Sequence, residues 1–273
     1  MAAVGRLRIA VGSRRTLSVV RGIGRRLAVA VGLFGFWQVL VWLTAAPPWI
    51  LPGPLQVLAA AVQRWESIAG HAATTVTEIV LGLIIGTVVG AASAVSLVQF
   101  HGLRRWLLPV LVVSQALPVF ALAPLLVLWL GYGLASKVAM AVLIIYFPVT
   151  AACYDGLRHT EPGWIDLART LGGSPWAIMC HVRAPAALPA FASGLRVATA
   201  VAPIGAVVGE WVGSSSGLGY LMLHANARMQ VDLMFAALLA LAMFALGLWF
   251  AVDALLRRLV FWQTDSSTLP HKD

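Results

Sequence analysis

The sequence predicts an all-helical integral membrane protein with both termini on the cytoplasmic side. Three observations lead to this fold class. Of 273 residues, 60% are hydrophobic and only 11% are charged, and the mean hydropathy of +0.89 lies outside the range of soluble domains. The apolar residues gather in runs long enough to cross a bilayer. The basic residues gather between alternate runs.

Six apolar runs approach the roughly 20 residues that a helix needs to cross the hydrocarbon core. The fourth run is short, and we expect Pro203 to interrupt the fifth. The predicted spans are Leu27–Ala46, Thr74–Val98, Leu107–Gly131, Val138–Tyr154, Leu188–Gly209 and Leu233–Leu256.

The basic residues predict the orientation. Seven arginines precede the first span with no acidic residue among them, whereas only Arg64, Lys137 and Arg228 fall on the opposite side. Both termini are therefore expected in the cytoplasm, as an even number of spans requires. The net charge of +9 has the same origin, so we expect contact with anionic lipid and no nucleic acid partner. Alternation adds to the cytoplasmic side Arg104, Arg105, Arg158, Arg169, Arg183, Arg257 and Arg258.

The N-terminal run resembles a targeting signal only in part. Ser13-Arg14-Arg15 is similar to a twin-arginine signal, and Ala45-Ala46 is similar to a cleavage site. The apolar run is longer than the roughly 7–15 residues of a signal sequence. We therefore expect a retained first span.

Small residues and prolines recur inside the spans. Gly82, Gly86 and Gly90 repeat at every fourth position, and Gly205, Gly209 and Gly213 do the same, which favours close helix packing over direct solute contact. Prolines in spans remove backbone hydrogen bonds and often mark a transport path. Together they favour a transporter over a passive anchor: Pro109, Pro118, Pro124, Pro148 and Pro203.

Few ionisable residues fall inside the spans. Arg196 can reach the interface, and Asp253 can pair with Arg257 one helical turn on. Glu78 and Glu210 have no such partner in their own helices, and a charge in hydrocarbon costs at least about 2.5–3.5 kcal/mol. They lie either near the solute path or at helix ends. The candidate path residues are Glu78, Gln115, Glu210, Trp211 and Tyr220.

Sequence patterns typical of enzymes are missing. The chain contains no G-x-x-x-x-G-K-[ST], H-E-x-x-H or G-x-S-x-G pattern and no Cys/His cluster. We therefore expect no catalytic residue, no metal site and no cofactor bound by this chain.

Residues 160–189 form an amphipathic, charged interruption of the apolar chain. Glu161-Pro162 is typical of a helix start, and Gly172-Gly173 of a helix end. Ser174-Pro175 is typical of a second start. The segment therefore predicts a short helix-turn-helix outside the membrane; a helix resting on lipid is the alternative. Its first helix carries the apolar stripe Ile165, Leu167, Ala168 and Leu171.

This segment resembles the EAA loop of ATP-binding-cassette (ABC) importer permeases. The resemblance lies in Asp166-Leu167-Ala168, in Gly172 and in Leu188-Pro189, with Asp in place of Glu and Leu in place of the usual Ala. Other stretches extend the resemblance. Two of them resemble the sulfonate, nitrate and taurine branch of this family: Ala123-Pro124-Leu125 with Trp129 and Gly131-Tyr132-Gly133, and Gly217-Leu218-Gly219-Tyr220-Leu221. Permeases for thiamine pyrimidine precursors are more similar in residues 202–213 and in the following LMLHANARMQ.

The resemblance implies a six-helix type I (MetI-like) permease in a bacterial inner membrane. Two copies would pair, each docking on one subunit of an ATPase dimer that binds ATP and Mg²⁺, and an extracytoplasmic binding protein would deliver the solute. The ATPase-coupling residues would be Asp166, Ala168, Gly172, Leu188 and Pro189. The implied organisation is a basic N-terminus (1–26), a first span and loop (27–70), a transmembrane domain (71–257) with its coupling loop (160–189), and a tail (258–273).

Trp211, Tyr220 and Glu210 also indicate which class of solute the protein carries. Trp211 and Tyr220 can stack a flat heterocycle and Glu210 can accept its amino hydrogens, whereas an anion would be repelled there. An aromatic belt at the interface is the alternative reading of the two rings. We expect a small heterocycle such as a thiamine pyrimidine precursor; the alternatives are a sulfonate, nitrate or taurine-type anion and, more distantly, a secondary carrier or channel.

Overall fold

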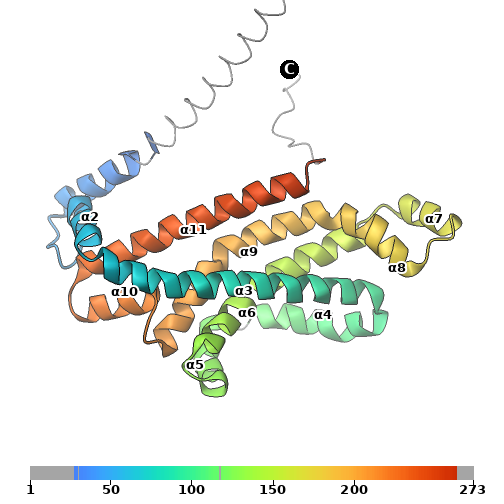
Figure 1. Cartoon of the computed structure of the whole chain (residues 1–273), viewed down its shortest axis with the longest axis horizontal. Coiled ribbons are helices and arrows are strands. Elements are labelled where there is room, and N and C mark those ends of the chain that lie inside the picture. Colours follow the sequence, from blue (N-terminus) through green and yellow to red (C-terminus); the bar gives the residue numbers. More distant parts are fainter. Residues whose placement is uncertain (1–27, 30, 117, 263–273) are drawn as a thin grey trace, which may run out of the picture.

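Long helices running side by side form the body of the molecule (Figure 1). The computed structural model describes residues 28–29, 31–116 and 118–262; the basic N-terminal segment and the end of the tail lie outside them. Within these residues, four helical stretches are long and apolar enough to cross a membrane, and they confirm the second, fourth, fifth and sixth predicted spans. They are α3 (Trp65–Gln99), α6 (Leu134–Arg158), the stretch Pro175–Gly213 that ends in α9 (Ala184–Gly213), and α11 (Val231–Leu259).

The third predicted span is wrong as a single helix. Its residues belong to α4 (His101–Ala116) and α5 (Val119–Leu130), which point in different directions (Figure 1). Pro118 lies between them in an extended conformation, with φ −61° and ψ 113°. A proline donates no backbone hydrogen bond, and the extended ψ of Pro118 itself turns the chain here. In the first predicted span, the structure describes a shorter apolar helix, Val31–Thr44.

Two other spans differ at their ends or in their middle. The predicted fourth span begins at Val138, which leaves Lys137 outside, but α6 begins at Leu134 and buries Lys137. The interruption predicted at Pro203 is wrong, because α9 continues through this residue. Proline removes one hydrogen bond but has a φ that a helix accepts, and the buried neighbours Ala202 and Ala206 hold the helix in place.

The two rows of glycine pack against the same helix, α6, except for Gly213, which packs against Val127 of α5. A Cβ atom on Gly86 of α3 would lie 2.7 Å from Cγ2 of Ile145, and one on Gly205 of α9 would lie 2.7 Å from Cα of Ala141. Both partners belong to α6, which is therefore held between α3 and α9 with little space between the backbones. This arrangement confirms that the small residues serve helix packing.

The bundle has two distinct ends. Two short helices, α7 (Pro162–Thr170) and α8 (Pro175–Ile178), lie at one end, which we call the α7 end (Figure 1). At the other, the α10 end, lie α2 (Pro54–Gln63) and α10 (Leu218–Ala227) (Figure 1).

Toward the α7 end, charged side chains join α9 to α11. Asp253 accepts hydrogen bonds from Nε of Arg196 at 2.7 Å and from Nε of Arg257 at 2.8 Å. The pair with Arg257 confirms the prediction made from the spacing of one helical turn. The pair with Arg196 shows that this arginine has a partner inside the protein.

We expect Gly205→Ala to lower the free energy of unfolding by about 1–3 kcal/mol, since the added methyl group would meet the backbone of α6 in a packed interface. Thermal unfolding of the purified protein in detergent measures the effect. Gly247→Ala in α11 is the matched control, because a Cβ atom there meets nothing within 4 Å. Equal losses of stability in the two variants would contradict the packing described above.

Candidate functional site

The structure confirms the predicted helix-turn-helix at the α7 end. Helix α7 begins at Pro162, directly after Glu161, and Gly172 has a φ of +80° two residues after its end. The amide of Gly172 donates to the carbonyl of Arg169, and that of Gly173 donates to the carbonyl of Ala168, both at 2.9 Å. These two bonds form a Schellman turn, which glycine permits because it adopts positive φ without strain.

A second cap follows at once. Ser174 accepts a hydrogen bond from the amide of Ala177 at 3.2 Å and so begins α8 at Pro175. One π-helical turn, Met179–Arg183, then joins α8 to α9. The turn is therefore connected to a membrane-spanning helix through continuous helical backbone.

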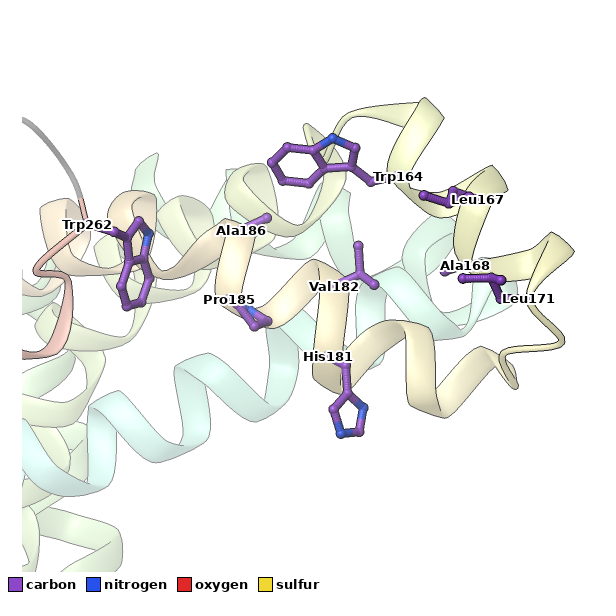
Figure 2. Close-up of a pocket in the computed structure, with 9 residues that line it drawn as sticks. All are labelled: Trp164, Leu167, Ala168, Leu171, His181, Val182, Pro185, Ala186 and Trp262. Carbon is purple, nitrogen blue, oxygen red and sulfur yellow. The ribbon is translucent and has the colours of Figure 1, made fainter.

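Most of the apolar stripe of α7 is exposed. Only Ile165 is buried, whereas Leu167 and Leu171 expose 60% and 79% of their surface. They border a pocket of about 450 Å³ between α7 and the beginning of α9 (Figure 2). Its lining is mainly apolar: Trp164, Leu167, Ala168, Leu171, His181, Val182, Pro185, Ala186 and Trp262.

The structure places the predicted coupling residues in two locations. Asp166 is exposed on α7 and lies 3.1 Å from the guanidinium of Arg169, a surface pair of little energetic weight that leaves the carboxylate accessible. Ala168 lines the pocket beside α7. Leu188 and Pro189 belong to α9, where Leu188 packs on the buried cluster of Ala192, Leu256 and Val260. The Leu-Pro pair thus sits in the packed body of the bundle rather than on α7.

At the α10 end, Glu210 holds the beginning of α10. Its side chain is 1% exposed and accepts hydrogen bonds from the hydroxyl of Thr75 at 2.6 Å and from the amides of Gly219 at 2.5 Å and Tyr220 at 3.4 Å. A carboxylate at the N-terminus of a helix satisfies amides that have no partner in the helix itself. Glu210 therefore fastens α10 to both α9 and α3.

Neighbouring groups complete this network, and sequence reasoning missed most of them. The hydroxyl of Thr75 also accepts a hydrogen bond from the amide of Leu218 at 2.7 Å, and Nδ1 of His71 accepts one from the amide of Gly217 at 3.1 Å. Gly217 has a φ of +115°, and a Cβ atom there would overlap the Glu210 carboxylate. The glycines before Tyr220 were the available signal, since they indicate close approach of the backbone to another group.

Glu78 has an ionic partner. Nζ of Lys137 lies 3.1 Å from its Oε1, and the two side chains are 6% and 0% exposed, respectively. An ion pair in this setting removes the cost of leaving either charge alone in the bundle. The partner comes from α6, so no pattern within α3 could indicate it.

The remaining path candidates also have local partners. The indole N–H of Trp211 donates to the carbonyl of Gly219 at 3.1 Å. The ring of Tyr220 lies between those of His71 and His224, with centroids 5.8 Å and 3.9 Å away. The side chain of Gln115 lies outside the described part of the structure. In this conformation, Glu78 and Glu210 bind protein groups and are buried from solvent.

A larger cavity lies elsewhere, among α4, α5, α6 and α9. Its volume is about 680 Å³, and the described residues that line it include no charged side chain. Exposed faces of Val197 and Ile204 on α9 border it, as do the rings of Tyr146 and Phe147 on α6. This cavity has the size and the apolar lining of a small-molecule site.

Comparison with known proteins identifies the family in which these features occur. The family profile described as "binding-protein-dependent transport system inner membrane component" matches residues 82–263. A probable ABC transporter permease protein of Haemophilus influenzae is 58% identical over 84% of this chain and 94% of its own. The formylaminopyrimidine transport permease of Halalkalibacterium halodurans is 34% identical over 85% and 94%.

Two further permeases differ in their named solutes. The riboflavin transport permease of Chloroflexus aurantiacus is 36% identical over 85% of this chain and 87% of its own, whereas the taurine permease of Escherichia coli is 28% identical over 88% and 91%. Among solved structures, a chain of the methionine ABC transporter MetNI in an inward-facing conformation matches with a TM-score of 0.56 at 21% identity, over 73% of this chain and 96% of that one.

We expect Thr75→Val to speed hydrogen exchange at the first amides of α10 by about fivefold to a hundredfold, since it removes one hydrogen bond to Glu210 and one from Leu218 in a buried network. Exchange mass spectrometry of the peptide covering residues 214–222 measures this. Thr77→Val is the control, because that hydroxyl is exposed and bonds only the carbonyl of Ala73 in its own helix. Unchanged exchange in Thr75→Val would show that Glu210 and His71 hold the start of α10 without Thr75.

Proposed function

The chain belongs to the family of binding-protein-dependent transport inner membrane components, and from this premise we propose how it is coupled to ATP hydrolysis, how it assembles and what it carries. It is a permease subunit of a MetI-like ABC importer. Permease subunits of this family are not catalytic, and a partner ATPase hydrolyses ATP.

Helix α7 is the docking element for the ATPase. The observation that carries this proposal is the apolar surface of Leu167 and Leu171, which is exposed at the α7 end instead of packing on the chain's own core. Asp166 offers an accessible carboxylate to a basic residue of the partner, and the Schellman turn at Gly172 lets the chain reverse at once. ATP and Mg²⁺ are then held by the ATPase alone.

The α7 end faces the cytoplasm in this assignment. Arg104 and Arg105 at the start of α4 and Arg158 at the end of α6 lie toward that end, which agrees with the positive-inside rule. The α10 end then receives the solute from an extracytoplasmic binding protein. The family name gives the inner membrane as location, and the bacterial relatives favour a bacterial inner membrane.

Two copies enclose the transport path. The apolar cavity of about 680 Å³ is bordered by α9 side chains that a single copy leaves exposed. A second copy placed against this face would cover them and turn an open cavity into a closed path. A homodimer is the simplest assembly that does so.

A flat, uncharged heterocycle fits this cavity best. Tyr146 and Phe147 supply rings for stacking. The described part of the lining has no charged group to pair with an anion, which would be costly to desolvate there. The relatives named for formylaminopyrimidine and riboflavin, at 34% and 36% identity, favour the same class over the taurine permease at 28%. The aromatic contacts then come from α6 instead of from Trp211 and Tyr220.

Movement of α7 is passed to the transport path through α9. When ATP closes the ATPase dimer, the docked α7 helices approach each other, and the helical connection through Met179–Arg183 carries this displacement into α9. ATP shifts the transporter between two conformations because the ATPase binds it with a different affinity in each one. No chemical step takes place in this chain.

Leu167→Asp is expected to reduce co-purification of the ATPase and solute-stimulated ATP hydrolysis by about tenfold or more, since it places a charge in an apolar contact. Asp166→Ala and Gly172→Arg are expected to abolish uptake while the protein remains in the membrane. Glu161→Ala is the control, as it removes an exposed charge just outside the docking face. Normal transport in reconstituted Gly172→Arg, or a permease that associates with no nucleotide-binding subunit through residues 160–189, would refute the coupling role.

The solute proposal is tested on the cognate binding protein. Calorimetric titration with formylaminopyrimidine, riboflavin and taurine is expected to show binding of a heterocycle and none of taurine. Binding of taurine or another sulfonate in preference to both heterocycles would assign this importer to the anion-carrying branch instead.

A further inference from the structure

A basic pocket lies between α4 and α6, toward the α7 end and apart from the docking face of α7. Its volume is about 450 Å³. Three arginines line it, Arg104 and Arg105 from the first turn of α4 and Arg158 from the last turn of α6. The other lining residues are Leu108, Pro109 and Tyr154.

The hydroxyl of Tyr154 has no partner in this pocket. The residue is 7% exposed, and its oxygen is buried without a hydrogen bond in the described part of the chain. A buried hydroxyl left in this state is costly, by about 1–3 kcal/mol. A ligand that accepts a hydrogen bond from Tyr154 would remove this cost.

The arginines are also without a counter-charge. Among the described residues, none of the three forms an ion pair within 4.0 Å. Asp155 is the acidic residue beside the pocket and does not neutralise three guanidinium groups. Guanidinium groups bind phosphate oxygens in pairs, and a tyrosine hydroxyl adds a donor of the same kind.

The pocket continues into an apolar groove. A second pocket of about 250 Å³ shares Leu108, Tyr154 and Arg158 with it and extends among α3, α4 and α6. Its other lining residues are mostly apolar: Leu97, Leu111, Phe147 and Ala151, with Thr150 and Asp155. Trp106, next to Arg105, exposes most of its ring, as aromatic residues do at the surface of a bilayer. A basic opening joined to an apolar groove matches the anionic headgroup and the apolar acyl chain of a phospholipid.

We propose that this pocket is a binding site for one anionic phospholipid. Its phosphate lies among Arg104, Arg105 and Arg158 and accepts a hydrogen bond from the hydroxyl of Tyr154. One acyl chain follows the groove among α3, α4 and α6. Basic pockets between transmembrane helices on the cytoplasmic side bind anionic headgroups by the same chemistry.

Occupancy of the site would join α4 to the end of α6, directly before the coupling helix α7. Arg104 and Arg105 belong to α4, whereas Arg158 lies four residues before Pro162, the first residue of α7. A phosphate held by both groups fixes the end of α6 and thereby the base of α7. Anionic lipid is then a ligand that sets the position of the coupling helix.

Lipid titration of the full purified chain tests the site. Native mass spectrometry in detergent, with phosphatidylglycerol added and phosphatidylcholine in parallel, is expected to show one preferentially retained anionic lipid. Tyr154→Phe should weaken its retention by about tenfold and Arg158→Gln by at least as much. Arg258→Gln, which removes an exposed charge in the last turn of α11, should leave retention unchanged.

Further readouts separate this site from a structural role and from a soluble anion. Without anionic lipid, Tyr154→Phe should unfold at the same or a higher temperature, because it removes only an unpartnered hydroxyl. Equal retention of both lipids, or the same loss in Arg258→Gln as in Arg158→Gln, would overturn the proposal. Displacement of the lipid by millimolar inorganic phosphate would also overturn it and assign the pocket to a soluble phosphate.

Discussion

The close approach of α3 and α9 to the two sides of α6 is the constraint on which the rest of this structure depends. Glycine at every fourth position removes the side chains that would hold these helices apart. Once the backbones are close, Glu78 of α3 meets Lys137 of α6, and Glu210 of α9 meets Thr75 of α3. The buried charges and the anchored α10 are therefore consequences of backbone packing, and neither would survive wider helix spacing.

Local sequence patterns predicted most of the helices, whereas the contacts between helices could not be predicted from the sequence. Hydropathy found four of the six predicted spans as long helices, and capping residues found the turn at Gly172. Hydropathy failed at Lys137, because whether a charge can be buried depends on a partner in another helix. Proline also has no single meaning: α9 continues through Pro203, and the chain turns at Pro118. Packing around each proline decides between these outcomes.

The candidate functional residues show the same difference between local and long-range signals. Asp166, Ala168 and Gly172 could be proposed from the sequence because the motif that contains them is local, and the structure shows the predicted turn at Gly172. Glu210 was noticed for the cost of its charge, but its partners include backbone amides of Gly219 and Tyr220, which side-chain chemistry does not reveal. A carboxylate in a membrane protein is thus as readily a structural anchor as a solute contact. The surrounding glycines distinguish the two.

The helix α9 extends from the π-helical turn after α8 to the buried carboxylate beneath α10. Its 30 residues span roughly 45 Å at about 1.5 Å per residue. A rod of this length that tilts by about 10° around one end moves its other end by about 8 Å. A small tilt of α9 about the α7 end would therefore displace Glu210, and with it the beginning of α10, by nearly that distance.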